Sequence, residues 1–154
     1  MNCMENTLQM IKNILPEAGT ELGSFTFLAA DRLWTGETDG IPYVVVAEDR
    51  WPCNQGGFCL AVTLEGAVYV SDLDNGSFTA CCASGFSQFI EILKLYQSAL
   101  NTASSLDMED EECDRHYEEL EQTLLQQIME IDAAAIEDTE GFWSTCIEEL
   151  ISGV

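Results

Sequence analysis

The stretch that decides the fold is residues 58–90, which read FCLAVTLEGAVYVSDLDNGSFTACCASGFSQFI. Three runs in it, Phe58 to Leu64, Ala67 to Asp72 and Phe78 to Ala83, are rich in β-branched and aromatic residues, as strands are. Glu65-Gly66 separates the first two runs and Asp74-Asn75-Gly76 the last two, and both are turns that favour antiparallel hairpins. The stretch therefore predicts a three-stranded meander at the centre of a sheet.

The residues that follow the meander predict a helix that packs on it. Ser84 is the expected N-cap. The apolar residues then recur at helical spacing over four turns: Phe86, Phe89, Ile90, Leu93 and Leu100. Because an apolar helical face needs a surface to cover, we expect this helix to lie on the meander.

Towards the N-terminus we expect one helix and further strands. Asn6 to Leu15 has apolar residues at helical spacing and is ended by Pro16. Ser24 to Ala29 and Tyr43 to Ala47 are strand-like runs bounded by turn-forming residues. The segments around the first two tryptophans, Trp34 and Trp51, read as loops.

The composition changes in the last third of the chain. Residues 105–154 hold 16 of the 28 acidic residues and one of the five basic residues, Arg115. Residues 105–114 form an acidic connector, and two helices are expected after it, around Tyr117–Ile131 and Thr139–Ile151. Both helices have apolar faces to bury, so we expect residues 1–154 to form a single domain. The predicted class is α+β, with an antiparallel-rich sheet of about five or six strands, an N-terminal helix, a helix after the meander and an acidic helical C-terminus.

The net charge of −23 on 154 residues restricts the partners of the chain. Since 47% of the residues are hydrophobic, the chain can form a core, and the excess charge belongs to its surface. Such a surface repels nucleic acid and anionic lipid and attracts basic proteins. No apolar run is long enough to span a bilayer, and the N-terminus lacks a signal-type pattern, so we expect a cytoplasmic protein.

Two stretches of the sequence carry the motifs of a known family. Residues 66–76, GAVYVSDLDNG, with residues 83–90, ASGFSQFI, match a strand pair with a G-x-[IV]-Y turn that leads to a helix start. Residues 131–136, together with Phe142-Trp143 and Glu148-Glu149-Leu150, are similar to the C-terminal ending of one subgroup. In these stretches the chain resembles the SUKH superfamily, the Smi/Knr-like proteins. The usual helical opening of the family is short in this chain.

The resemblance implies an α+β binding scaffold without catalytic activity. Members of the superfamily are mostly small bacterial cytoplasmic proteins, many of them thought to be immunity proteins of polymorphic toxin systems. Nuclease toxins need cationic surfaces to hold phosphates, so the acidic surface fits an inhibitor of a basic toxin of that kind. The alternative function is a regulatory scaffold that docks onto another cytoplasmic protein, as the yeast relative is believed to do. A need for solubility would also account for an acidic surface. A halophilic source would give a similar excess of acids but would spread them over the surface, whereas here they cluster in one third of the chain.

The candidate partner-binding residues are acidic side chains with two aromatic anchors. Because single exposed charges contribute about 0–1 kcal/mol each, a strong effect needs several charges together or an aromatic anchor. The acidic set, which we name the 107–119 acids, is Asp107, Glu109, Asp110, Glu111, Glu112, Asp114, Glu118 and Glu119. Trp34 and Trp51 are the candidate anchors, although packing of each against the sheet accounts for it equally well.

Catalytic, metal-binding and cofactor-binding residues are not expected. Cys113 and His116 stand one helical turn apart and could form a thiol–imidazole pair or half of a zinc site, with Cys53 and Cys59 as the remaining ligands. An exposed histidine on a solvated helix is the simpler interpretation. Residues 72–76 imitate the start of a calcium loop but lack its closing glutamate, so they are read as a hairpin turn. The seven cysteines, an odd and irregularly spaced set, are read mainly as small buried hydrophobes.

Overall fold

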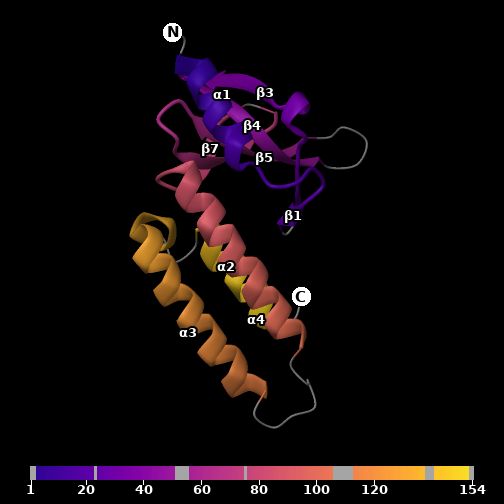
Figure 1. The fold of residues 1–154 in the computed structure, drawn as a ribbon, viewed down its shortest axis with the longest axis vertical. Helices are drawn as coiled ribbons and strands as arrows, with labels where there is room; N and C mark the ends of the chain where they lie inside the picture. Colours follow the sequence, from indigo (N-terminus) through magenta and orange to yellow (C-terminus); the bar gives the residue numbers. More distant parts are fainter. Residues whose placement is uncertain are drawn as a thin grey trace. The chain divides into compact units, whose positions relative to one another are not determined.

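The computed structural model describes residues 3–22, 24–50, 56–74, 76–105, 113–137 and 141–152. It is an α+β structure with an antiparallel sheet and helices at both ends of the chain, which confirms the predicted class. The chain divides into two compact units, Met1–Ile90 and Glu91–Val154. The first unit holds the sheet, and the second holds the C-terminal helices (Figure 1). The expected single-domain organisation stays a prediction.

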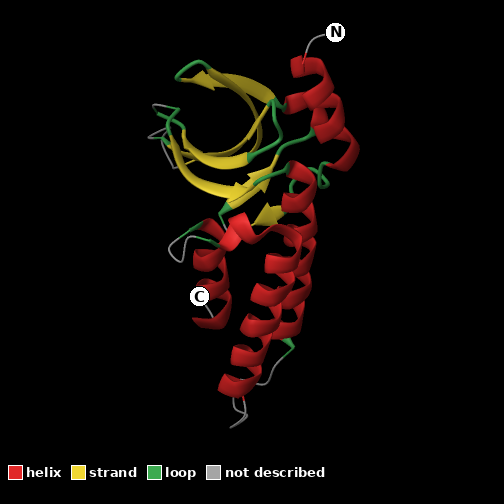
Figure 2. Cartoon of the chain, turned by 90° about the vertical axis from the view of Figure 1, so that its left-hand side faces the viewer, coloured by secondary structure: helices red, strands yellow, loops and turns green. Residues whose placement is uncertain are grey.

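The first unit contains helix α1 (Cys3–Ile14) and one seven-stranded sheet. The strands are β1 (Glu21–Leu22), β2 (Phe25–Phe27), β3 (Trp34–Thr38), β4 (Ile41–Arg50), β5 (Gly57–Thr63), β6 (Val68–Asp72) and β7 (Phe78–Ala83). Their order is β1-β2-β4-β5-β6-β7, with β3 paired to β4. All these pairings are antiparallel. Figure 2 shows that the sheet is strongly curled.

The meander forms as the sequence predicts. At the first turn, the amide of Gly66 donates to the carbonyl of Thr63 at 2.9 Å, and the φ of Gly66 is 96°, a value that glycine adopts without strain. At the second turn, the amide of Gly76 donates to the carbonyl of Asp72 at 2.7 Å. The Asp72 carboxylate accepts from the amide of Asp74 at 2.8 Å. The described residues of this segment, 72–74 and 76, are therefore part of a hairpin turn.

Strand β3 was expected to be a loop, and this prediction is wrong. Residues 34–38 pair in register with β4, and Gly36 lies opposite Tyr43. A glycine and two threonines give little hydrophobic alternation, so the sequence shows no strand signal here. The glycine is required by the packing, because a Cβ atom at Gly36 would lie 2.5 Å from the hydroxyl oxygen of Tyr43. The Tyr43 ring thus covers the glycine across the strand pair.

Replacing Gly36 with alanine is expected to lower the free energy of unfolding by about 1–3 kcal/mol, the usual cost of overpacking. The Tyr43 ring cannot move away freely, because it packs edge-on against Phe78 at a centroid distance of 5.6 Å. Urea unfolding measures the loss. Thr35→Ala, at an exposed position on the same strand, is the control and should change stability by less than about 0.5 kcal/mol. Equal midpoints for the two variants would contradict the packing role of Gly36.

An aromatic cluster lies on one face of the sheet. Tyr43, Val45, Cys59 and Ala61 are buried together, with Leu28, Trp34, Leu73 and Phe78 packed against them. Phe78 also stacks on Tyr69, with ring centroids 4.6 Å apart. Outside this cluster, Ile11 of α1 is fully buried, and the hydroxyl of Thr7 donates to the carbonyl of Leu64 at 3.2 Å. These contacts fix α1 beside the end of β5.

Two expectations about single residues in this region are corrected. Cys81 was expected to be buried like the other cysteines, but it is exposed and Cys82 is buried. Side chains alternate along β7, so Thr79 and Cys81 lie on the exposed face and Phe78, Ala80 and Cys82 on the covered face. Gly85, not Ser84, occupies the N-cap position of the next helix, since its carbonyl accepts the first helical hydrogen bond from Phe89 at 3.0 Å.

The helix after the meander is α2 (Phe86–Ser104), and its first residues belong to the sheet-containing unit. Phe86 and Phe89 are buried, and the rings of Phe89 and Phe27 lie 6.5 Å apart. The start of α2 therefore packs on the sheet as predicted. Leu100 is 44% exposed and does not belong to the buried face to which it was assigned.

The second unit contains the rest of α2 with α3 (Cys113–Asp132), the 3-10 helix η3 (Ala133–Ile136) and α4 (Phe142–Ser152). Trp143 is fully buried, and its ring centroid lies 5.9 Å from that of Tyr96 on α2. The Tyr96 hydroxyl donates to the carbonyl of Cys146 at 3.4 Å, and the Tyr117 hydroxyl donates to the carbonyl of Ala103 at 3.4 Å. These contacts join α2 to both α4 and α3. No helix among the described residues is long and apolar enough to cross a membrane.

Candidate partner-binding surface

Helix α3 carries exposed carboxylates along one side. Tyr117, Leu124 and Ile128 recur at helical spacing and are buried, so they form the covered stripe of α3. Glu118, Glu119 and Glu130 lie off this stripe and are exposed. The amphipathic pattern of the sequence therefore sets both the buried stripe and the acidic side of α3.

The single arginine of α3 hardly reduces this negative charge. Arg115 Nε lies 3.3 Å from Glu119 Oε1, and the two side chains are 68% and 63% exposed. At such exposure an ion pair contributes about 0–1 kcal/mol and is screened by salt. The exposed side of α3 consequently stays acidic and open to a basic surface.

Only part of the 107–119 acids falls within the described residues. Glu118 and Glu119 lie exposed on α3. Asp114 belongs to the first turn of α3, but its side chain is not among those described. Asp107, Glu109, Asp110, Glu111 and Glu112 lie outside the described residues, as does Trp51. Their part in partner binding stays a prediction.

Trp34 lies on β3 and is held from two directions. Its ring packs against the cluster around Tyr43 and Val45, and its side chain is half-buried. The indole Nε1 donates to Glu48 Oε2 at 2.8 Å, a charge-assisted hydrogen bond. The structure thus gives Trp34 a packing role in the sheet, and its role as a partner anchor stays a prediction.

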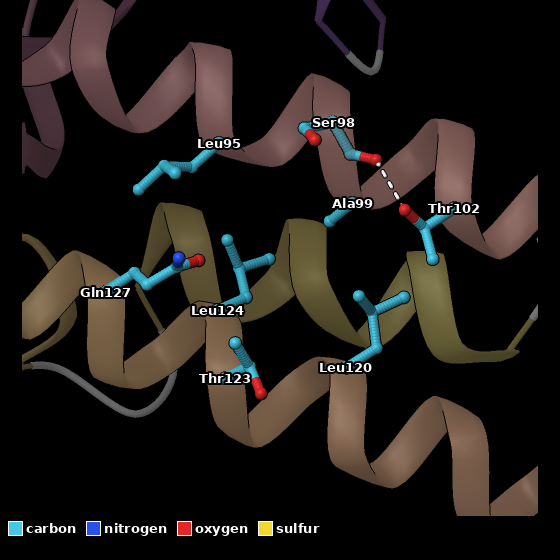
Figure 3. Close-up of a pocket in the computed structure, with 8 residues that line it drawn as sticks. All are labelled: Leu95, Ser98, Ala99, Thr102, Leu120, Thr123, Leu124 and Gln127. Carbon is cyan, nitrogen blue, oxygen red and sulfur yellow. Dashed lines mark hydrogen bonds between the residues drawn. The ribbon is translucent and has the colours of Figure 1, made fainter.

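A small groove lies between α2 and α3 (Figure 3). Its volume is about 120 Å³. The residues that line this α2–α3 groove are Leu95, Ser98, Ala99 and Thr102 from α2 and Leu120, Thr123, Leu124 and Gln127 from α3. Ala99 and Leu124 are buried and form the apolar floor, whereas the four polar side chains are exposed at the rim.

The α2–α3 groove was not predicted from the sequence. Leu120 and Leu124 stand one turn apart in the predicted helix, but Leu124 is buried whereas Leu120 is only half-buried and borders the groove. One feature of the sequence could have indicated the groove. Ala99, a small residue, lies one turn after Leu95 on a helix that packs beside α3. Small side chains on one helix leave a hollow where the facing helix carries leucines.

The structure describes only some of the residues of the thiol–imidazole pair and of the zinc set considered above. His116 is half-buried on α3, while the side chain of Cys113 and all of Cys53 lie outside the described part of the chain. Cys59 is buried in the sheet. No group of three or more His, Cys, Asp or Glu side chains among the residues that the structure describes is arranged to hold a metal ion.

Comparison with known proteins relates the chain to a protein family. The model of a family described as SUKH-4 immunity protein matches residues 14–149, which include every strand and all of α2 and α3. No curated protein and no solved structure matches the chain. The matched range runs through both compact units, so the likeness concerns the sheet and the helices together.

Proposed function

This chain belongs to the SUKH-4 immunity protein family, and from that membership we propose that it binds and neutralises a basic toxin, a nuclease, in the cytoplasm. Family membership is the observation that carries the proposal, because an immunity-type function implies a toxin partner. The protein acts by covering the surface of the toxin and performs no catalysis of its own.

The charge of the chain supports a basic partner. With 28 acidic and five basic residues, the chain attracts a cationic surface and repels an anionic one. A nuclease must present cationic side chains to hold the phosphates of its substrate. An acidic inhibitor competes for those same side chains, and complementary charge also speeds the encounter.

Co-expression tests the proposal. The toxin domain encoded next to the gene for this chain is induced in a bacterial host, alone or together with this chain. We expect the chain to restore colony counts to those of uninduced cells and to keep cellular nucleic acid intact. An unrelated acidic protein of similar net charge is the control, since it carries the charge without the fold and should give no protection.

Two other results would change the assignment. Protection from a neighbouring toxin that leaves nucleic acid intact in the absence of this chain would keep the immunity function and reject the nuclease. A gene without any toxin domain beside it, and a protein that binds a non-basic cytoplasmic partner, would favour the alternative regulatory scaffold.

A further inference from the structure

The α2–α3 groove is large enough for one or two side chains but smaller than a typical small-molecule pocket. Pockets that bind small molecules usually enclose about 300–1,000 Å³, whereas this groove encloses about 120 Å³. Figure 3 shows Leu95, Leu120 and Leu124 directed into the space between the two helices. One or two apolar side chains from another protein fit such a space, in the manner of a helix docked in a groove.

Two carboxylates lie at one end of the groove. Leu95 and Gln127 face each other at that end (Figure 3). Glu91 precedes Leu95 by four residues and Glu130 follows Gln127 by three, so each lies one turn beyond the groove on the same side of its helix. Both glutamates are exposed. The basic residue of α2, Lys94, is turned about 100° from Leu95 around the helix axis.

This combination identifies the chemistry of the occupant. The apolar floor favours an apolar side chain, and the carboxylates favour lysine or arginine beside it. A second copy of this chain is disfavoured, because two molecules of net charge −23 repel each other. We propose that the groove receives an amphipathic helix of the basic toxin, with an apolar residue between Leu95 and Leu124 and a lysine or arginine at Glu91 and Glu130. The inference rests on the proposed immunity function and specifies the surface that performs it.

A pair of tryptophan variants tests the groove. Thr123 lines the groove, and its neighbour Gln122 is exposed on a different side of α3. Thr123→Trp fills the groove and is expected to weaken binding of the neighbouring toxin domain by about 10-fold or more, because it blocks an apolar anchor. Gln122→Trp adds the same ring elsewhere and should change the affinity less than about 2-fold. Binding is measured by calorimetry, and far-UV circular dichroism confirms that both variants fold.

Charge variants test the end of the groove. Glu91→Gln and Glu130→Gln should each weaken binding by about 2- to 5-fold at low salt and by less at high salt. Glu148→Gln, at an exposed position on α4, is the matched control and should have no effect. Isotope-labelled wild-type protein should show its largest amide shift changes at Leu95, Ala99 and Leu124 when the toxin domain is added.

The possible outcomes distinguish a failure of the groove proposal from a failure of the proposed function. If the wild-type chain neither binds the toxin domain nor protects cells from it, the proposed function fails. If it does both, yet the two tryptophan variants bind equally well or equally poorly, the function stands and the groove proposal is overturned. A wild-type dimer that Thr123→Trp converts to a monomer would also overturn it, since the occupant would then be a second copy.

Discussion

Trp143→Ala is expected to lower the free energy of unfolding of the second unit, Glu91–Val154, by about 3–5 kcal/mol. This is the range for truncating a buried aromatic side chain. Trp143 is fully buried, and its ring contacts Phe142 edge-on at 5.1 Å and Tyr96 of α2 at 5.9 Å. The Tyr96 hydroxyl is hydrogen-bonded one turn further along α4, to the carbonyl of Cys146. Removing the indole therefore opens a cavity where α2 and α4 meet.

Urea unfolding followed by circular dichroism at about 222 nm, where helices dominate the signal, measures this loss. Glu148→Ala, exposed on the same helix, is the control and should stay within about 0.5 kcal/mol of the wild type. A midpoint for Trp143→Ala equal to that of the control would show that the buried Trp143 ring does not contribute to stability.

The same variant also tests the single-domain organisation. After the substitution, the remaining tryptophans are Trp34 and Trp51, both within residues 1–90. Their fluorescence then reports the sheet-containing unit alone, whereas the circular dichroism signal reports mainly the helices. Because α2 is continuous from one unit into the other, we expect the two transitions to coincide. Separate transitions would indicate two domains.

The sequence predicted those parts of the fold that have strong local signals. The meander follows from β-branched runs separated by short turn-forming segments, and Gly66 and Gly76 in these segments have the positive φ values that glycine tolerates. Strand β3 was missed because its pairing is determined by tertiary packing. Gly36 is acceptable in a strand only because the Tyr43 ring covers it, and Tyr43 lies on a neighbouring strand. The exposure of Cys81 follows from the alternation of side chains along β7, which the interpretation of the cysteines as small buried hydrophobes did not take into account.

The sequence predicted the negative charge of the candidate surface but not its shape. Charge counts place an excess of carboxylates after residue 105, and Glu118 and Glu119 are indeed exposed on α3. The α2–α3 groove could not be predicted, because it depends on how Ala99 of one helix faces Leu124 of another. Composition determines the net charge of the surface, whereas the packing of two helices determines the shape of the groove.

Neutralising the 107–119 acids is expected to lower the association rate with the toxin domain by about 10-fold or more at roughly 50 mM salt, where charge steering is strong. The variant replaces each aspartate with asparagine and each glutamate with glutamine, so the side chains keep their size. Each acid contributes little alone, but together they form the field that a cationic protein meets first. At about 500 mM salt the difference between variant and wild type should nearly vanish, because exposed charges are then screened. Stopped-flow mixing measures the rates.

The matched control removes the same number of negative charges from the sheet-containing unit. It neutralises eight exposed acids: Glu5, Glu17, Glu21, Asp31, Glu37, Asp39, Glu65 and Asp74. Both variants therefore have the same net charge and differ only in where the charge was lost. If clustering on the C-terminal third steers the toxin, the control should associate at nearly the wild-type rate. Equal slowing of the two variants would mean that net charge alone sets the encounter, and unchanged rates in both would mean that apolar contacts hold the complex without electrostatic steering.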